Sequence, residues 1–146
     1  MANEDDWQLI AAYERYLTSG EEADFWAWDE LRLLVQRDPA HAWRVIKALL
    51  EEVDPARLDV VGAGPLEQLL GAVADQLDDE SDELLRAIED FAVTSEKARR
   101  ALAVVYPDER DPRELWDRID AILGSSVHDR HRVRGQKPNE QGRPTE

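Results

Sequence analysis

The sequence predicts an all-α fold of about seven helices, stacked as antiparallel helical hairpins in one compact domain. Apolar residues recur every three or four positions through most of the chain, which is the period of a helix buried on one side. Asp-Pro pairs, glycines and Ser caps divide this pattern into separate helices. No stretch alternates apolar and polar residues as a strand would. A chain of 146 residues fits one domain, expected at residues 1–124.

The first three helices are predicted from clear start and stop signals. The first runs from about Asp5 to Leu17, and Gly20 ends that region. The second covers about Asp24 to Arg37. The third starts at Asp38-Pro39, an N-cap followed by a proline at the first helical position, and Asp54-Pro55 stops it.

The middle of the chain predicts a connection followed by a fourth helix. The connection from Pro55 to Gly64 can hold a short turn at 56–59. The two glycines that follow favour a loop, and Pro65 is typical of a first helical position. The fourth helix is therefore expected from Pro65 to about Leu77, with Gly64 as its N-cap.

Three more helices are predicted before the chain becomes polar. They cover about Ser81–Val93, Ser95–Tyr106 and Asp111–Leu123, with Gly124 as the C-terminal cap of the last. Glu114 is placed to complete a capping box at the start of the last helix. Residues 125–146 have almost no apolar content and predict a disordered basic tail.

The charge of the chain limits its partners. Thirty-three acids oppose 18 Lys and Arg, for a net charge of −15. Such a surface repels nucleic acid and anionic lipid, so neither is expected to bind directly, while a basic protein would be attracted. Acidity can equally serve solubility alone. The chain has no cysteine, no leader-like start and no membrane-length apolar run, so a cytoplasmic protein is expected.

Three segments carry a family resemblance. They are F-W-A-W at 25–28, A-W-R-V-I at 42–46 and A-G-P-L-E-Q-L-L at 63–70. As an ordered set, they resemble a family of small bacterial helical domains of unknown function with an A-G-P-L-E-x-L-L hallmark. The similarity covers roughly Trp7 to Tyr106, with Gln68 departing from the usual short residue. It implies an all-α fold and a bacterial origin, and it carries over no catalytic residue.

Glu67 in this hallmark has two interpretations. As the third residue of a helix that begins after Gly64, its carboxylate would bond a free backbone N–H and complement the helix dipole. Alternatively, it is presented at the mouth of a pocket, where Glu67, Arg44 and His41 would form a ligand site. A pocket that joins these three residues would favour the second interpretation.

The chain has five tryptophans, and three of them lie on predicted apolar helix faces. Trp7, Trp43 and Trp116 are therefore expected in the core. Trp26 and Trp28 lie about 200° apart on a helix and cannot both point inward. One of them, or the preceding phenylalanine, should be partly exposed, either as a protein-binding anchor or as a contact within the fold.

No catalytic, metal or cofactor signature stands out. The acidic run from Asp78 to Glu83 has a glutamate where a calcium-binding EF-hand loop needs glycine. No serine or threonine lies in a nucleophile motif. The protein is therefore expected to be no enzyme, with no metal and no cofactor.

The leading functional hypothesis is a non-enzymatic, acidic protein-interaction module. Its sharper form is an inhibitor, such as the immunity protein of a basic bacterial toxin that attacks nucleic acid. The alternatives are a small enzyme or ligand-binding domain centred on Glu67, Arg44 and His41, and a self-assembling subunit such as a homodimer. The candidate partner-binding residues combine carboxylates with one aromatic anchor; they are Trp26, Asp29, Glu30, Glu51, Glu52, Asp78, Asp79 and Glu80.

Overall fold

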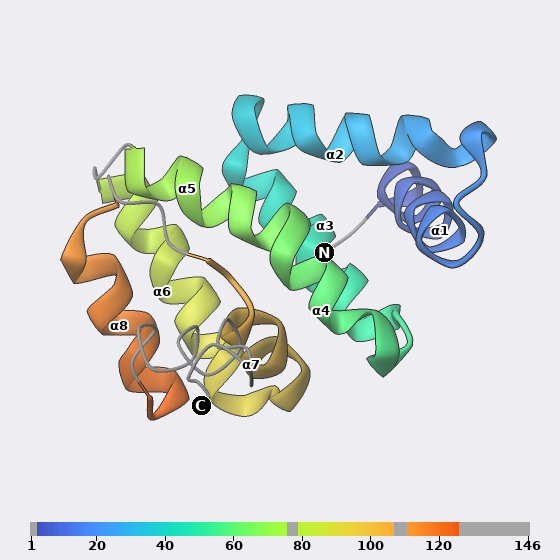
Figure 1. The fold of residues 1–146 in the computed structure, drawn as a ribbon. Coiled ribbons are helices and arrows are strands. Elements are labelled where there is room, and N and C mark those ends of the chain that lie inside the picture. The colour runs from blue at the N-terminus through green and yellow to red at the C-terminus, as the bar shows by residue number, and fades with distance from the viewer. Residues whose placement is uncertain (1–2, 76–78, 107–110, 126–146) are drawn as a thin grey trace, which may run out of the picture.

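The computed structural model describes residues 3–75, 79–106 and 111–125 of the chain. Every regular element in these ranges is helical, which confirms the all-α prediction (Figure 1). The predictions made for Asp78 and for residues 126–146 lie outside the described residues.

The first three helices lie close to their predicted bounds, because their cap signals act locally. Gly20 ends the first helix with a left-handed φ of 69°. The Asp38 side chain accepts a hydrogen bond from the His41 backbone N–H at 3.2 Å, with Pro39 at the first helical position. The elements of this part are α1 (Glu4–Ser19), the 3₁₀ turn η1 (Glu22–Asp24), α2 (Phe25–Arg37) and α3 (Pro39–Glu52).

The predicted loop before the fourth helix is wrong. Helical backbone instead runs through both glycines, and Gly62 has a right-handed φ of −65°. Pro65 has no N–H to donate, and it lies inside a π-helical turn rather than at a helix start. Gly64 is therefore no N-cap. The elements are η2 (Pro55–Arg57), α4 (Leu58–Val61), the π-helical segment η3 (Gly62–Leu66) and α5 (Glu67–Asp75).

The last three helices lie near their predicted ranges, but the one predicted to reach Tyr106 ends at Ala103, and one predicted cap is wrong. The predicted capping box of Glu114 is wrong, because Pro112 takes the N-cap position and makes no side-chain cap bond. Asp111 instead accepts a hydrogen bond from Trp116 Nε1 at 3.1 Å. Gly124 ends the last helix with a φ of 73°, as predicted. These helices are α6 (Asp79–Thr94), α7 (Glu96–Ala103) and α8 (Arg113–Leu123).

The helices form two groups on either side of the long segment α4–η3–α5 (Figure 1). α1, α2 and α3 pack against one another in sequence, and α2 and α3 also contact α5. On the other side, α6 and α7 pack together and both contact α8. α7 also contacts α3, α4 and η3, so it joins the two groups.

A charged contact fastens α8 to α6. Arg118 on α8 reaches Glu89 at 2.5 Å and Asp82 at 2.7 Å. These hydrogen bonds raise the pKa of Arg118 above its usual range, chiefly through Glu89. Asp82 also contacts Arg86 at 3.1 Å, so these two α6 carboxylates already have arginine partners within the fold.

The tryptophan predictions are confirmed at four positions and wrong at one. Trp43 and Trp116 lie in the core, and of the pair on α2, Trp26 is exposed while Trp28 is half-buried. Trp7, however, is 45% exposed. The reason is that α1 turns Asp6, its neighbour 100° around the helix, toward α3.

Gly62 is where two helical backbones meet. A Cβ atom on this residue would lie 2.1 Å from the Ala101 carbonyl oxygen of α7 and 2.7 Å from Val104 Cγ2. A real side chain cannot occupy such a position, and the carbonyl belongs to backbone that cannot move cheaply. Glycine at this position is therefore required by packing rather than by a turn.

We expect Gly62→Ala to destabilise the protein by about 3 kcal/mol, because the added methyl group must separate η3 from α7. Gly71→Ala in α5 is the matched control, since a Cβ there meets no atom within 4 Å. It should stabilise the helix by about 0.5–1 kcal/mol. Urea unfolding of both variants measures the difference, and equal midpoints would contradict the close approach.

Candidate functional site

A groove lies between the C-terminal half of α1 and η1. Its volume is about 550 Å³, and it is largely open to solvent. Its polar lining combines three carboxylates, two hydroxyls and one arginine. The lining residues are Ala11, Glu14, Arg15, Thr18, Ser19, Glu21 and Asp24.

The one arginine of the groove is already neutralised. Arg15 Nη2 lies 3.2 Å from Asp24 Oδ1, and Arg15 Nε also donates to this carboxylate. Within the described residues, no such partner is found for the side chains of Glu14 and Glu21. The groove therefore has an excess of negative charge.

Glu14 is the most perturbed carboxyl group of this groove. Partial burial raises the pKa of Glu14 above its usual range, and repulsion by the Glu52 carboxylate raises it further. Glu52 stands at the last residue of α3 and is exposed. The ends of α1 and α3 thus bring two like charges together, a combination that a cation would stabilise.

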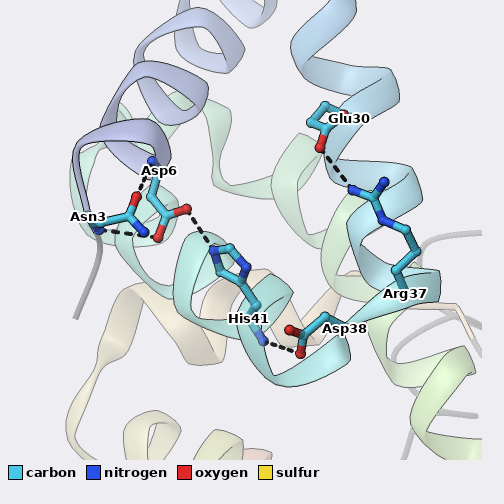
Figure 2. Close-up of polar contacts among 6 residues, drawn as sticks. All are labelled: Asn3, Asp6, Glu30, Arg37, Asp38 and His41. Atoms are coloured by element: carbon cyan, nitrogen blue, oxygen red, sulfur yellow. Dashed lines mark hydrogen bonds and ion pairs between the residues drawn. The ribbon is translucent and has the colours of Figure 1, made fainter.

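The N-terminal ends of α1 and α3 are joined by a hydrogen-bonded pair of side chains instead of repelling charges (Figure 2). His41 Nε2 lies 2.7 Å from Asp6 Oδ1. Asp6 also accepts from the Asn3 backbone N–H, while Asn3 accepts from the Asp6 N–H. Asp6 is only 4% exposed and has partners for both oxygens. His41 is thus a structural link between α3 and α1.

The predicted partner-binding residues are spread over three helices. Trp26 is 49% exposed on α2 and follows the groove residue Asp24 almost directly. Asp79 and Glu80 lie exposed in the first turn of α6, at the opposite end of the molecule from α1 (Figure 1). The residues do not form one surface.

Two of the predicted acids are already paired on their own helix. Asp29 contacts Arg32 at 2.8 Å, and Glu30 contacts Arg37 at 3.0 Å (Figure 2 shows the second pair). Glu51 and Glu52, in contrast, are exposed at the end of α3 with no described partner for their carboxylates. Of the predicted set, Glu52 is therefore the residue that the structure connects to the groove.

Exposed aromatic surface lies next to the groove. Phe25 is 43% exposed, packs edge-on against Tyr16 and stacks on Trp28 at a centroid distance of 5.3 Å. Trp26 and Leu33 lie on one exposed stripe of α2, seven residues apart. Phe25 and Trp26 thus place apolar area beside negative charge, as protein-binding surfaces do.

The second predicted site, Glu67 with Arg44 and His41, is not joined by any contact among the described residues. Glu67 Oε1 accepts a hydrogen bond from the Tyr106 backbone N–H at 2.7 Å, just after the end of α7. Arg44 is exposed, and His41 is bonded to Asp6. Glu67 does line a separate pocket of about 270 Å³, whose other lining residues are Gln68, Leu70, Gly71, Tyr106, Asp111 and Trp116.

The predicted role of Glu67 as a cap of its own helix is wrong. Its carboxylate bonds a backbone N–H, but the N–H belongs to the chain that leaves α7, 39 residues away, and not to the start of its own helix. Gly62 allows η3 to approach α7 closely, and the Glu67 hydrogen bond links the same two parts of the chain.

The contacts of two residues in this region, Glu14 and Asp6, are not predicted by the sequence. Both Glu14 and Asp6 lie within the first predicted helix, where nothing local marks their contacts. Helical spacing puts Glu14 on one stripe with Trp7, which the sequence assigns to the core, so spacing alone does not place Glu14 at the surface. Its proximity to Glu52 requires the tertiary fold.

These observations define an acidic, all-helical domain with a charged groove. The chain belongs to the family of unknown function DUF6869, whose match covers residues 15–127. No curated protein and no solved structure matches the chain significantly. Within the described ranges, no cluster of His, Asp and Glu is arranged to hold a metal ion. None of the described helices is both long and apolar enough to cross a bilayer.

We expect Glu67→Ala to cost about 1–2 kcal/mol of stability, because the Tyr106 N–H loses its acceptor. Glu67→Gln keeps an acceptor oxygen and should lose clearly less. Urea unfolding of the two variants compares them. Equal losses would show that the hydrogen bond contributes nothing.

We expect the carboxyl titration of Glu14 in Glu52→Gln to move toward the usual pKa without reaching it, because burial is the larger cause of the raised pKa. Carbon-13 NMR of the side-chain carboxyl measures this. Glu83→Gln, an exposed acid on α6, is the control and should leave the Glu14 pKa unchanged. An unchanged midpoint in Glu52→Gln would remove the proposed repulsion.

The raised pKa of Glu14 also fixes the sign of its effect on stability. Since the folded pKa lies above the unfolded one, Glu14's contribution is fully present below the unfolded pKa and is lost as pH rises through the folded pKa. Glu14→Gln should therefore be more stable than the parent chain at neutral pH, and the difference should shrink in acid.

Proposed function

We propose that this protein is a non-enzymatic interaction module that binds a basic partner protein through the groove between α1 and η1. The observation that carries the proposal is the uncompensated negative charge there. Arg15 is already paired with Asp24, whereas Glu14 is repelled by Glu52.

An entering lysine or arginine side chain would satisfy this groove. Its charge would meet Glu14 and Glu21 and would relieve the repulsion between Glu14 and Glu52. Long-range attraction by a chain of net charge −15 would raise the rate of encounter. The neighbouring Phe25 and Trp26 would supply apolar contact that excludes water.

The sharper form of the proposal is an inhibitor of a protein that acts on nucleic acid, as an immunity protein inhibits a toxin. Proteins that bind nucleic acid present lysine and arginine to phosphates. A groove with carboxylates on both walls presents negative charge to the same cations. The inhibitor form of the proposal is supported by the negative charge of the groove. It defines the partner only as a protein with a basic surface for phosphates.

The test begins with the tagged full chain, used to capture proteins at about 0.05–0.1 M salt, where screening is weak. The captured partner is then purified, and its affinity is measured for two variants of equal charge. Glu14→Gln/Glu52→Gln alters the groove, while Glu83→Gln/Asp90→Asn alters exposed acids of α6.

We expect the groove variant to bind about 10-fold more weakly and the control variant to bind like the parent chain. Binding to the parent should weaken as salt increases. Equal loss in both variants would indicate general attraction to an acidic surface and would overturn the proposed groove. Failure to retain any basic protein would count against the function itself.

A further inference from the structure

The chain itself contains a basic segment that matches the groove. Residues 126–146 hold five bases and three acids, in contrast to the acidic residues before them. Three of the bases, Arg130, Arg132 and Arg134, alternate along the chain. In extended backbone, alternate side chains point to the same side, so this spacing would present three guanidinium groups as one row.

We propose that residues 126–146 bind in cis to the groove between α1 and η1, where their arginines meet Glu14, Glu21 and Glu52. The segment would thereby compete with any basic partner for the same carboxylates. This inference rests on the proposed function in taking the groove as a site for cations, but it needs no second protein.

Charge compensation distinguishes this groove from several acids elsewhere on the molecule. Asp29 and Glu30 on α2 are paired with Arg32 and Arg37. On α6, Asp82 and Glu89 are occupied by Arg118. A guanidinium that approached these acids would have to displace an existing partner. At Glu14 and Glu52 it would instead separate two like charges.

Chain length permits the contact. The segment follows Ser125, just after Gly124 ends α8. Roughly 20 residues can span up to about 70 Å when extended, whereas a compact domain of this size has a radius of gyration of about 14 Å. The later arginines can therefore reach any face of the domain.

Competition in cis would lower the apparent affinity of a partner for the groove. A tethered segment acts at an effective concentration in the millimolar range, so even a weak contact is substantially occupied. A partner must then displace it, and its apparent affinity falls by the fraction of groove that is free. Salt would weaken both contacts together, since both depend on exposed charge.

The test uses the full chain, which has no cysteine of its own. Gly135→Cys, next to Arg134, carries a nitroxide spin label, and the broadening of backbone amide signals is measured by NMR without any partner. We expect broadening to concentrate at residues 14–21 and at Glu51 and Glu52 in about 0.02 M salt. It should be lost in about 0.5 M salt.

Two variants of the labelled chain make the test specific. Glu14→Gln/Glu52→Gln should abolish the localised broadening, and Glu83→Gln/Asp90→Asn should preserve it. Broadening that is spread evenly, or that centres on another face, would overturn the inference. So would localised broadening that the groove variant leaves intact.

The two proposals can fail separately. If a basic partner binds through the groove while the label broadens no groove signal, only the contact in cis is wrong. If the label marks the groove but no basic protein is retained, the contact in cis stands and the proposed function fails.

Discussion

The close approach of Gly62 to Ala101 determines how the two halves of this fold meet. Because Gly62 has no side chain, η3 lies directly against the Ala101 carbonyl of α7. Glu67, one helical turn further on, then bonds the Tyr106 N–H where the chain leaves α7. α7 also contacts α3 and α4 near this junction, and α3 in turn contacts α5. The contact between the two helix groups at η3 and α7 therefore requires a residue without a side chain at position 62.

The sequence predicted most helix ends correctly because their signals are local. Gly20, Gly124 and Asp38 act within one turn of the backbone that they cap. The region around Pro65 was misread for the complementary reason. Two glycines and a proline are local helix breakers, yet here the glycine allows a close tertiary contact and a π-helical turn accommodates the proline. Local propensity could not reveal a benefit that arises only when α7 is in place.

The candidate site was predicted in part. Features that depend on one helix could be read from the sequence, whereas contacts between distant residues could not. The pairing of Asp29 with Arg32 could be read from helical spacing, and it weakens the case for that acid as a partner contact. Trp26 was correctly expected at the surface as one of the α2 aromatics. The link from Asp6 to His41 spans 35 residues, and the repulsion of Glu14 by Glu52 also joins separate helices. Such pairs exist only once α1 and α3 lie side by side.

The net charge determines that the molecule attracts cations. Which acids already have arginine partners determines where on the surface a cation binds. A chain at −15 draws cations to its whole surface. The arginines are distributed unevenly: Arg32 and Arg37 pair with the two acids of α2, and Arg118 pairs with Asp82 and Glu89 on α6. Toward the C-terminal ends of α1 and α3, the charge of Glu52 instead adds to the burial that raises the pKa of Glu14. A basic side chain therefore gains more at the groove than at the paired acids, because at the groove it replaces repulsion with attraction. Specific binding to a uniformly acidic protein requires such a local difference.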